Sequence, residues 1–326
     1  MKQTVLAGIR ATSQLHIGNY LGAVKGMLEL EKSGEYETFF MVADLHAITT
    51  PFNPLELRKN KYEVVIDYLA CGLDPKKSTI FLQSTVGEHA EFAFYLSSLV
   101  TIARMQHLPT FKEKVKQYPN SATLALLNYP TLMASDILLY NAEKVPVGLD
   151  QEPHLEIARE IARKLNSNYG LDFKEPKRFK TKGAYVPSLT GEGKMSKSVK
   201  GSAIMLADNL DTIKSKLFAV PTDSGKGVVV PTKGGVNTLL VLSELFFDLD
   251  ERKSLEKKYL STGIKYKEIK EKLAEKVYET LLPIQEKRRY FENNSKIVQE
   301  IIDTGRIKAK KVANNNLKKV KQAMGL

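Results

Sequence analysis

Cysteine is almost absent from this chain, since Cys71 is the single one among 326 residues. One cysteine permits no internal disulfide, and Cys71 stands in an apolar stretch where a small buried side chain is expected. No spacing of Cys and His typical of a zinc site occurs, so we expect no bound zinc. These absences argue against a disulfide-rich scaffold and a zinc protein.

Long apolar runs are missing as well. No stretch of about 18 apolar residues is present, so no segment is expected to cross a membrane. The chain passes from Met1 directly into an apolar segment at Thr4 to Ile9, without the charged leader and apolar core of a secretory signal. We therefore expect a soluble, cytoplasmic protein.

Positive charge is what the chain has in excess. Its 49 basic and 37 acidic side chains give a formal net charge of +12. Such a balance favours an anionic partner, such as nucleic acid or nucleotide, although a merely lysine-rich protein has the same composition.

Short apolar segments alternate with helical patterns through the first half of the chain. Expected strands lie at residues 5–9, 38–42, 79–82 and 145–148, and expected helices at 19–31, 54–69, 88–99 and 150–166. This alternation predicts an α/β fold with a Rossmann-like parallel sheet. Ligands of such sheets bind at the carboxyl ends of the strands.

After about Lys200 the pattern becomes mostly helical and rich in lysine. Helices with a single apolar stripe are expected at 253–260, 266–287 and 295–324. We therefore predict two domains, 1–200 for substrate activation with a helical insertion and 201–326 as a helical domain.

The loop after the first strand holds the first candidate site. Gly18 begins a helix, where free N–H groups and the helix dipole favour phosphate. His16 and Asn19 flank it as short polar groups that can hydrogen-bond phosphate oxygens during reaction. An ordinary strand-to-helix turn has the same appearance, and the dinucleotide fingerprint Gly-x-Gly-x-x-Gly is absent.

A second candidate site lies far along the chain. Lys194 and Lys197 sit in Lys-Met-Ser-Lys-Ser, directly after Gly191-Glu192-Gly193. Two lysines on a mobile loop can neutralise a leaving pyrophosphate. A solvated basic loop is the alternative in a chain so rich in lysine.

Taken together, the His-Ile-Gly-Asn and Lys-Met-Ser-Lys-Ser segments resemble the two signature motifs of class I aminoacyl-tRNA synthetases. The resemblance implies attack of an amino-acid carboxylate on the α-phosphate of ATP, which carries Mg²⁺. The aminoacyl group then passes to the terminal ribose of tRNA, a step of protein biosynthesis. It implies catalytic roles for His16, Asn19, Lys194 and Lys197.

One helix between the two motifs carries a carboxylate on an apolar face. Tyr129, Met133 and Asp136 share this face, and no Arg or Lys lies within a turn of Asp136. A buried carboxylate needs a partner, which an indole N–H would supply. Pairing with a distant basic residue or a helix N-terminus is the alternative that the helix alone favours.

The resemblance nonetheless extends in order over nearly the whole chain to the bacterial tryptophanyl-tRNA synthetases. It implies L-tryptophan, ATP and tRNA(Trp) as partners, a homodimer, and an anticodon-binding role for residues 201–326. Asp136 would then accept the indole N–H. The implied tryptophan-binding residues are Asp136, Met133, Tyr129, His46, Gln151 and Leu6. The implied ATP-binding residues are Arg10, Ala11, Thr12, Gly18, Asn19, Gly148, Leu149, Asp150, Val186, Lys194, Met195, Ser196, Lys197 and Ser198.

Three departures and three rivals accompany this interpretation. After the second motif, Val199-Lys200 replaces a more usual acidic or Asn-bearing run. Ala11-Thr12-Ser13 replaces the usual Pro-Ser/Thr-Gly turn, and Leu6 stands where an aromatic residue often packs on the indole. The related tyrosine enzyme would typically have an additional Tyr in the first strand, which Val5-Leu6-Ala7 lacks. A small nucleotidyltransferase is not expected to have both the second motif and a basic helical domain of this size. A non-catalytic basic RNA-binding protein is favoured only by the charge.

Overall fold

The computed structural model describes residues 2–180, 185–197 and 199–326. They form two compact units. The first unit comprises residues 2–13, 26–180 and 291–326, and the second comprises 14–25, 185–197 and 199–290. Each unit is described by itself below.

A five-stranded parallel sheet organises the first unit, with the strand order β3-β2-β1-β4-β5. In the register, Leu6 of β1 pairs with Phe39 of β2, and Phe39 pairs with Thr79 of β3. The strands are β1 (Gln3–Arg10), β2 (Tyr36–Ala43), β3 (Thr79–Leu82), β4 (Lys144–Val145) and β5 (Lys177–Arg178). The predicted α/β class with a Rossmann-like parallel sheet is confirmed.

The predicted strand at 145–148 is wrong in its extent. β4 ends at Val145. Its only pairing with β1 is between Lys144 and Val5, so the strand is too short to reach Gly148. Gly148 instead precedes a short 3₁₀ turn, η4 (Leu149–Gln151), that leads into a helix.

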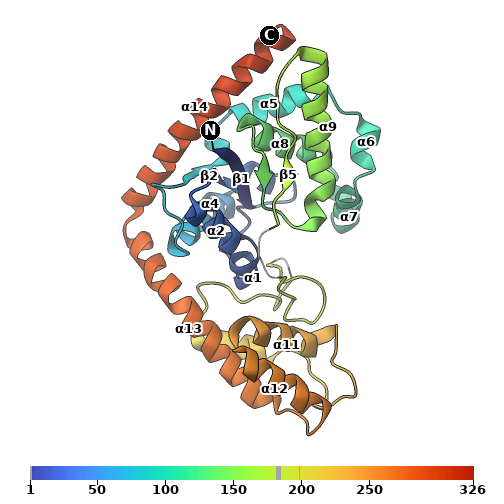
Figure 1. The fold of residues 1–326 in the computed structure, drawn as a ribbon, viewed down its shortest axis with the longest axis vertical. Helices are drawn as coiled ribbons and strands as arrows, with labels where there is room; N and C mark the ends of the chain where they lie inside the picture. The colour runs from blue at the N-terminus through green and yellow to red at the C-terminus, as the bar shows by residue number, and fades with distance from the viewer. Residues whose placement is uncertain (1, 181–184, 198) are drawn as a thin grey trace. The chain divides into compact units, whose positions relative to one another are not determined.

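Helices cover the sheet of the first unit, and Figure 1 shows α5, α8 and α9 packed together beside it. The helices of this unit are α2 (Lys25–Ser33, whose first residue belongs to the second unit), α3 (Asp44–Ala47), α4 (Pro54–Ala70), α5 (Glu88–Ser97), α6 (Ile102–Gln106), α7 (Pro109–Gln117), α8 (Leu124–Leu139), α9 (Glu152–Tyr169) and α14 (Ser295–Met324).

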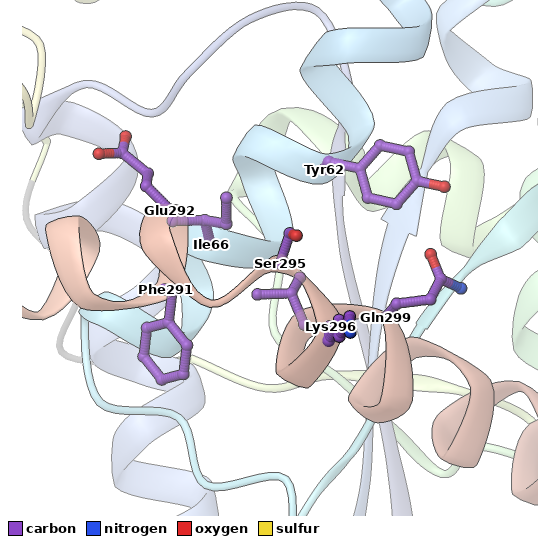
Figure 2. A pocket seen from close by; sticks show the side chains of 8 residues that line it. Tyr62, Ile66, Phe291, Glu292, Ser295, Lys296 and Gln299 are labelled. Carbon is purple, nitrogen blue, oxygen red and sulfur yellow. The ribbon is translucent and has the colours of Figure 1, made fainter.

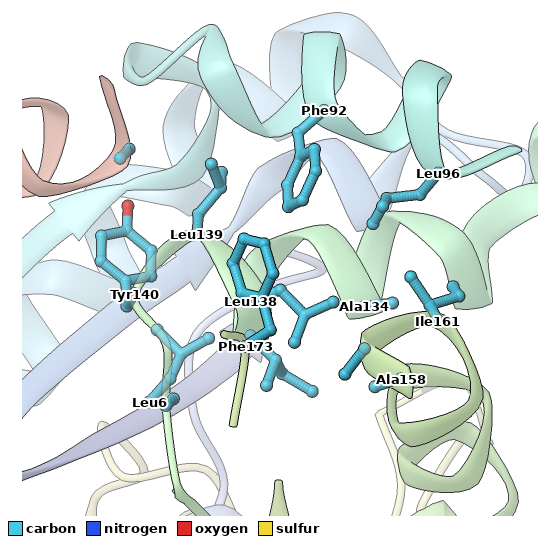
Figure 3. Packing of buried hydrophobic residues seen from close by; sticks show 14 of the residues in the cluster. Leu6, Phe92, Leu96, Ala134, Leu138, Leu139, Tyr140, Ala158, Ile161 and Phe173 are labelled. Carbon is cyan, nitrogen blue, oxygen red and sulfur yellow. The ribbon is translucent and has the colours of Figure 1, made fainter. Parts of the chain in front are cut away.

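Apolar side chains of the sheet and these helices form one buried cluster. Figure 3 shows Leu6 of β1, Phe92 of α5 and Leu138 of α8 within it, and each is at most 3% exposed. Burial on this scale supplies most of the stabilisation of a domain. The cluster thereby fixes α8, which bears Asp136, against the sheet.

The C-terminal helix α14 packs on β3 and belongs to the first unit. Asn316 donates its side-chain amide to the carbonyl of Leu139 at 2.8 Å. The compact units are thus discontinuous in sequence, whereas one boundary near Lys200 was predicted. The stripe of apolar residues in α14 packs against the sheet rather than against the helices that precede it in sequence.

The second unit is helical around an irregular segment. Its helices are α1 (Ile17–Asn19), the π-helical turn η1 (Tyr20–Val24), α10 (Leu210–Phe218), α11 (Gly234–Phe246), α12 (Leu249–Leu260) and most of α13 (Tyr266–Asn293). The buried ammonium of Lys270 donates to the carbonyl groups of Phe218 and Val220 and so caps the end of α10. In neither unit does a described helix have the length and apolar character needed to span a membrane.

Candidate active site

The second unit brings the two sequence motifs together. Ile17 donates its backbone N–H to the carbonyl of Ile204 at 2.9 Å, and His16 forms an antiparallel bridge with Met205. A Cβ on Gly18 would lie 3.4 Å from the Cβ of Met195 and 2.9 Å from the ring of His16. The glycine therefore makes room for the ring of His16, and the first loop lies in contact with the Lys-Met-Ser-Lys segment, about 180 residues away in sequence.

His16 is 4% exposed and interacts electrostatically with both lysines of the second motif. Burial, and then the charges of Lys197 and Lys194, lower the pKa of His16 to about 4. The imidazole is therefore neutral near pH 7. Its buried Nδ1 has no hydrogen-bond partner among the described residues.

The side chain of Asn19 stabilises the loop in which it lies. Its side-chain oxygen accepts a hydrogen bond from the backbone N–H of His16 at 3.2 Å. This bond satisfies one of the N–H groups left unpaired at a helix start.

The segment before Lys194 is a hydrogen-bonded hairpin. Met195 donates its N–H to the carbonyl of the buried Val186 at 2.9 Å, and Ser188 donates to Gly193 at 3.0 Å. Gly191 and Gly193 have φ values of 87° and 70°, which non-glycine residues rarely adopt.

The other predicted residues of the second motif vary in exposure. Ser196 donates its N–H to the hydroxyl of Ser202 at 3.1 Å, Lys194 is exposed and Lys197 is half-buried. Ser198 lies outside the described residues.

In the first unit, Asp136 of α8 is buried and accepts three hydrogen bonds. Its Oδ1 accepts from Gln83 Nε2 at 2.7 Å and from His89 Nδ1 at 2.6 Å. Its Oδ2 accepts from His46 Nε2 at 2.8 Å. Burial alone would raise the pKa of Asp136, but the bonds from His46 and His89 outweigh it and keep the pKa below its usual value. The group is therefore a carboxylate, and both imidazoles must donate to it.

Asp136 has partners within the protein, from elements distant in sequence. Its partners come from α3, which directly follows β2 (His46), from the turn η2 (Gln83–Thr85), which directly follows β3 (Gln83), and from α5 (His89). Pairing with distant residues was the alternative that the helix alone favoured, and it is the one observed, although through imidazole and amide groups.

Three further contacts hold this cluster in place. The Gln83 side-chain oxygen accepts from the backbone N–H groups of Leu45 and His46 at 3.0 and 3.3 Å. His89 Nε2 meets the Tyr140 hydroxyl at 2.8 Å. Gln83, His89 and Tyr140 were not predicted, although Gln83 could have been, because it directly follows a strand of the parallel sheet.

A second polar cluster lies beside the first, where the ring of His46 meets the ring of Tyr129 edge-on at 6.4 Å. Tyr129 Oη lies 2.6 Å from Nε2 of His154, and His154 Nδ1 lies 3.1 Å from the side-chain oxygen of Gln151. His154, which sequence reasoning missed, thus links Tyr129 to Gln151, and the ring contact with His46 joins this pair to Asp136. Its position three residues after Gln151 on α9 was the available signal.

The other two predicted tryptophan-binding residues are apolar. Leu6 is 3% exposed within the buried cluster of the sheet, and Met133 packs against that cluster.

Predicted ATP-binding residues of the first unit lie at two strand ends. Thr12 donates its N–H to the carbonyl of Arg10 at 2.9 Å, which forms a tight turn with the buried Ala11 at its centre. Gly148, Leu149 and Asp150 are exposed in the segment after β4. The turn exists without the Pro and Gly usual there.

Two surface cavities lie apart from these clusters. Figure 2 shows one of about 400 Å³, lined by side chains of α4, the end of α13 and the start of α14, including Tyr62, Phe291 and Gln299. The other, of about 240 Å³, lies between α3 and α4 and includes Asp44 and Ser84. No predicted site residue is among the described residues that line either cavity, and the described residues contain no cluster of three or more potential metal ligands.

Comparison with known proteins decides the family. The family model described as tRNA synthetases class I (W and Y) matches residues 1–282. The chain belongs to this family. Membership in this class I synthetase family confirms the resemblance drawn from the two motifs and makes the protein an aminoacyl-tRNA synthetase.

Two ligases and one solved structure illustrate the similarity over the whole chain. The tryptophan–tRNA ligase of Helicobacter pylori (strain J99 / ATCC 700824) is 43% identical over 331 residues, covering 100% of this chain and 99% of the relative. That of Porphyromonas gingivalis is 37% identical and covers 99% of each chain. A crystal structure of tryptophanyl-tRNA synthetase from Campylobacter jejuni, complexed with ADP and tryptophan, matches with a TM-score of 0.86 and 33% identity, covering 99% of this chain and 100% of that one.

Proposed function

We propose that this synthetase is a tryptophan–tRNA ligase. It activates L-tryptophan with ATP, which forms tryptophanyl-adenylate and releases pyrophosphate, and it then transfers tryptophan to the 3′ end of tRNA(Trp). Full-length relatives with this name and the neighbouring structure that holds ADP and tryptophan support the assignment.

The hydrogen bonds of Asp136 carry the choice of amino acid. A carboxylate offers about four acceptor positions, and three on Asp136 are occupied by protein donors. The remaining position is on Oδ2, the oxygen that His46 also contacts. An indole fits this remaining acceptor because it has one N–H donor on a large apolar body. Met133 and Leu6 supply adaptable apolar surface for that body.

ATP binding is assigned to the residues that the resemblance to the tryptophan enzymes implies. In the second unit, His16, Asn19, Lys194 and Lys197 act on the phosphates, Gly18 and Val186 contact the nucleoside, and Met195, Ser196 and Ser198 complete the loop. In the first unit, Arg10, Ala11 and Thr12 hold ATP, and Gly148, Leu149 and Asp150 meet the ribose. A neutral His16 with an unpaired Nδ1, close to two lysines, supports the phosphate assignment. Mg²⁺ arrives with ATP.

The remaining partners follow from the same assignment. The residues after 200 bind the anticodon arm of the tRNA, and the protein acts in the cytoplasm. It forms a homodimer, which is supported by three exposed apolar side chains of the first unit. These are Phe94, Ile102 and Leu124, between 67% and 83% exposed, on α5, α6 and the start of α8.

ATP–pyrophosphate exchange with each of the twenty amino acids tests the function. We expect exchange with tryptophan alone. Exchange with tyrosine and not tryptophan would identify the related tyrosine enzyme, and no exchange at all would favour a basic RNA-binding protein. The chain contains no Trp, so binding of tryptophan can also be followed by selective fluorescence.

A further inference from the structure

The buried His154 has polar neighbours on both ring nitrogens. It lies in the first turn of α9 and is 1% exposed. Its Nδ1 lies 3.1 Å from Gln151 Oε1, and its Nε2 lies 2.6 Å from the Tyr129 hydroxyl and 2.9 Å from the Thr110 hydroxyl. The two hydroxyl oxygens are themselves 2.7 Å apart. Each ring nitrogen therefore has at least one hydrogen-bonding neighbour.

These contacts define which nitrogen carries the proton. The side-chain oxygen of Gln151 can only accept, so His154 Nδ1 must donate. The orientation of the Gln151 amide is set independently, because its Nε2 donates to the Asp150 carboxylate at 2.7 Å. Burial, and then the nearby His46, lower the pKa of His154 to about 4, so the ring is neutral near pH 7. Nε2 then has a lone pair and accepts.

The hydroxyl protons follow from this tautomer. Tyr129 and Thr110 have one hydroxyl proton each, and one of them must point to Nε2 of His154. The other lies in the 2.7 Å contact between the two hydroxyl groups. Both protons are therefore used within the triangle, and the Tyr129 oxygen presents only lone pairs to its surroundings.

We propose that His154 is a positioning residue that makes Tyr129 and Gln151 acceptors for the ammonium group of the amino-acid substrate. This inference rests on the proposed function, because it is the resemblance to the tryptophan enzymes that implies a place for those two residues near that ammonium. An ammonium group has three donors and no acceptor, so it matches oxygens that can only accept. A neutral ring also adds no positive charge beside the ammonium.

Two partial substrates separate this role from general structural support. Tryptamine has the ammonium without the carboxylate, and 3-indolepropionate has the carboxylate without the ammonium. Each is measured as an inhibitor of tryptophan-dependent ATP–pyrophosphate exchange with the unchanged protein, with His154→Leu and with His154→Gln. The Gln side chain keeps one donor and one acceptor, whereas Leu keeps neither.

We expect His154→Leu to raise the inhibition constant of tryptamine about tenfold or more and that of 3-indolepropionate less than about twofold, as loss of a hydrogen bond to a charged group predicts. His154→Gln should restore most of the tryptamine affinity. An equal loss for both compounds, or no loss for tryptamine, would overturn the proposal. Lack of tryptophan-dependent exchange in the unchanged protein would instead overturn the proposed function, and this inference with it.

Nitrogen-15 NMR of the histidine-labelled, unchanged protein tests the same idea where the Leu variant does not fold. We expect His154 to be neutral and protonated at Nδ1 at pH 7. Protonation at Nε2 instead would turn a donor toward the two hydroxyl groups and would overturn the proposal.

Discussion

Among single residues, Asp136 shows how a buried charge is held ready for a ligand. Three protein donors offset much of the cost of burying the carboxylate. The sequence identified Asp136 by its apolar surroundings, but it could not identify all the donors. His46 and Gln83 follow neighbouring parallel strands, so their proximity was predictable from topology. His89 reaches the carboxylate from within α5, and only helix packing determines that contact.

Replacing Asp136 by Ala tests the role of its carboxylate in recognising the indole N–H. Two imidazoles and an amide would lose their acceptor, and the ligand would lose a charged hydrogen-bond partner worth about 1.5–3 kcal/mol. We expect kcat/KM for tryptophan to fall about 10- to 100-fold or more, while KM for ATP stays within about twofold.

The matched probe for this variant is the tryptophan analogue in which sulfur replaces the indole N–H. The unchanged protein should prefer tryptophan strongly over this analogue, whereas Asp136→Ala should use the two compounds with similar efficiency. If the variant prefers tryptophan over the analogue as strongly as the unchanged protein does, Asp136 does not bind the indole N–H.

At the scale of elements, periodicity predicted most strands and helices, because each segment alone buries one apolar face. It overestimated β4, since the length of that strand depends on pairing with β1 and β5 rather than on its own residues. It also placed the helix now seen as α14 within a C-terminal domain. The sign of its true position was Gly305, an isolated glycine within a long helical pattern, which marks a close backbone approach.

Gly305→Ala tests how tightly α14 packs on β3. Alanine favours a helix over glycine by about 1 kcal/mol. However, the new Cβ would meet the carbonyl group of Ile80, 2.7 Å from its carbon, and must displace the helix. Overpacking of this kind costs about 1–3 kcal/mol or more, so we expect a net decrease in the free energy of unfolding in urea.

The adjacent Thr304→Ala is the control for that substitution, because Thr304 is exposed on the same helix. It should leave the protein unchanged or slightly more stable. Equal or greater stability of Gly305→Ala relative to the unchanged protein would contradict the packing of α14 against the strand.

At the scale of the whole molecule, each unit is assembled from separate stretches of chain. The loop with His16 belongs with residues after 185, and residues 291–326 return to the sheet. A single boundary follows naturally from composition, because the lysine-rich helical half begins near residue 200. Composition reports local structure, however, and it does not report which distant segments share a core.

Both units contain a buried histidine that resists protonation, which makes the whole protein sensitive to acid. The pKa values of His16 and His154 are lowered from 6.5 to about 4, in each case mainly by burial. Between these values the unfolded chain binds protons that the folded protein does not. Unfolding therefore takes up protons, and the free energy of unfolding decreases as pH falls from 6.5 towards 4.

We expect a loss of about 2 kcal/mol for each of these histidines at pH 5 relative to pH 7.5, as the linkage relation predicts. Thermal unfolding at a series of pH values measures it. His154→Gln removes one of the two groups, so its melting temperature should fall less steeply between pH 7.5 and 5 than that of the unchanged protein. Parallel curves for the two proteins would mean that His154 is protonated in the folded state at pH 5. The acceptor role of its Nε2 would then be restricted to higher pH, because a charged ring has donors on both nitrogens.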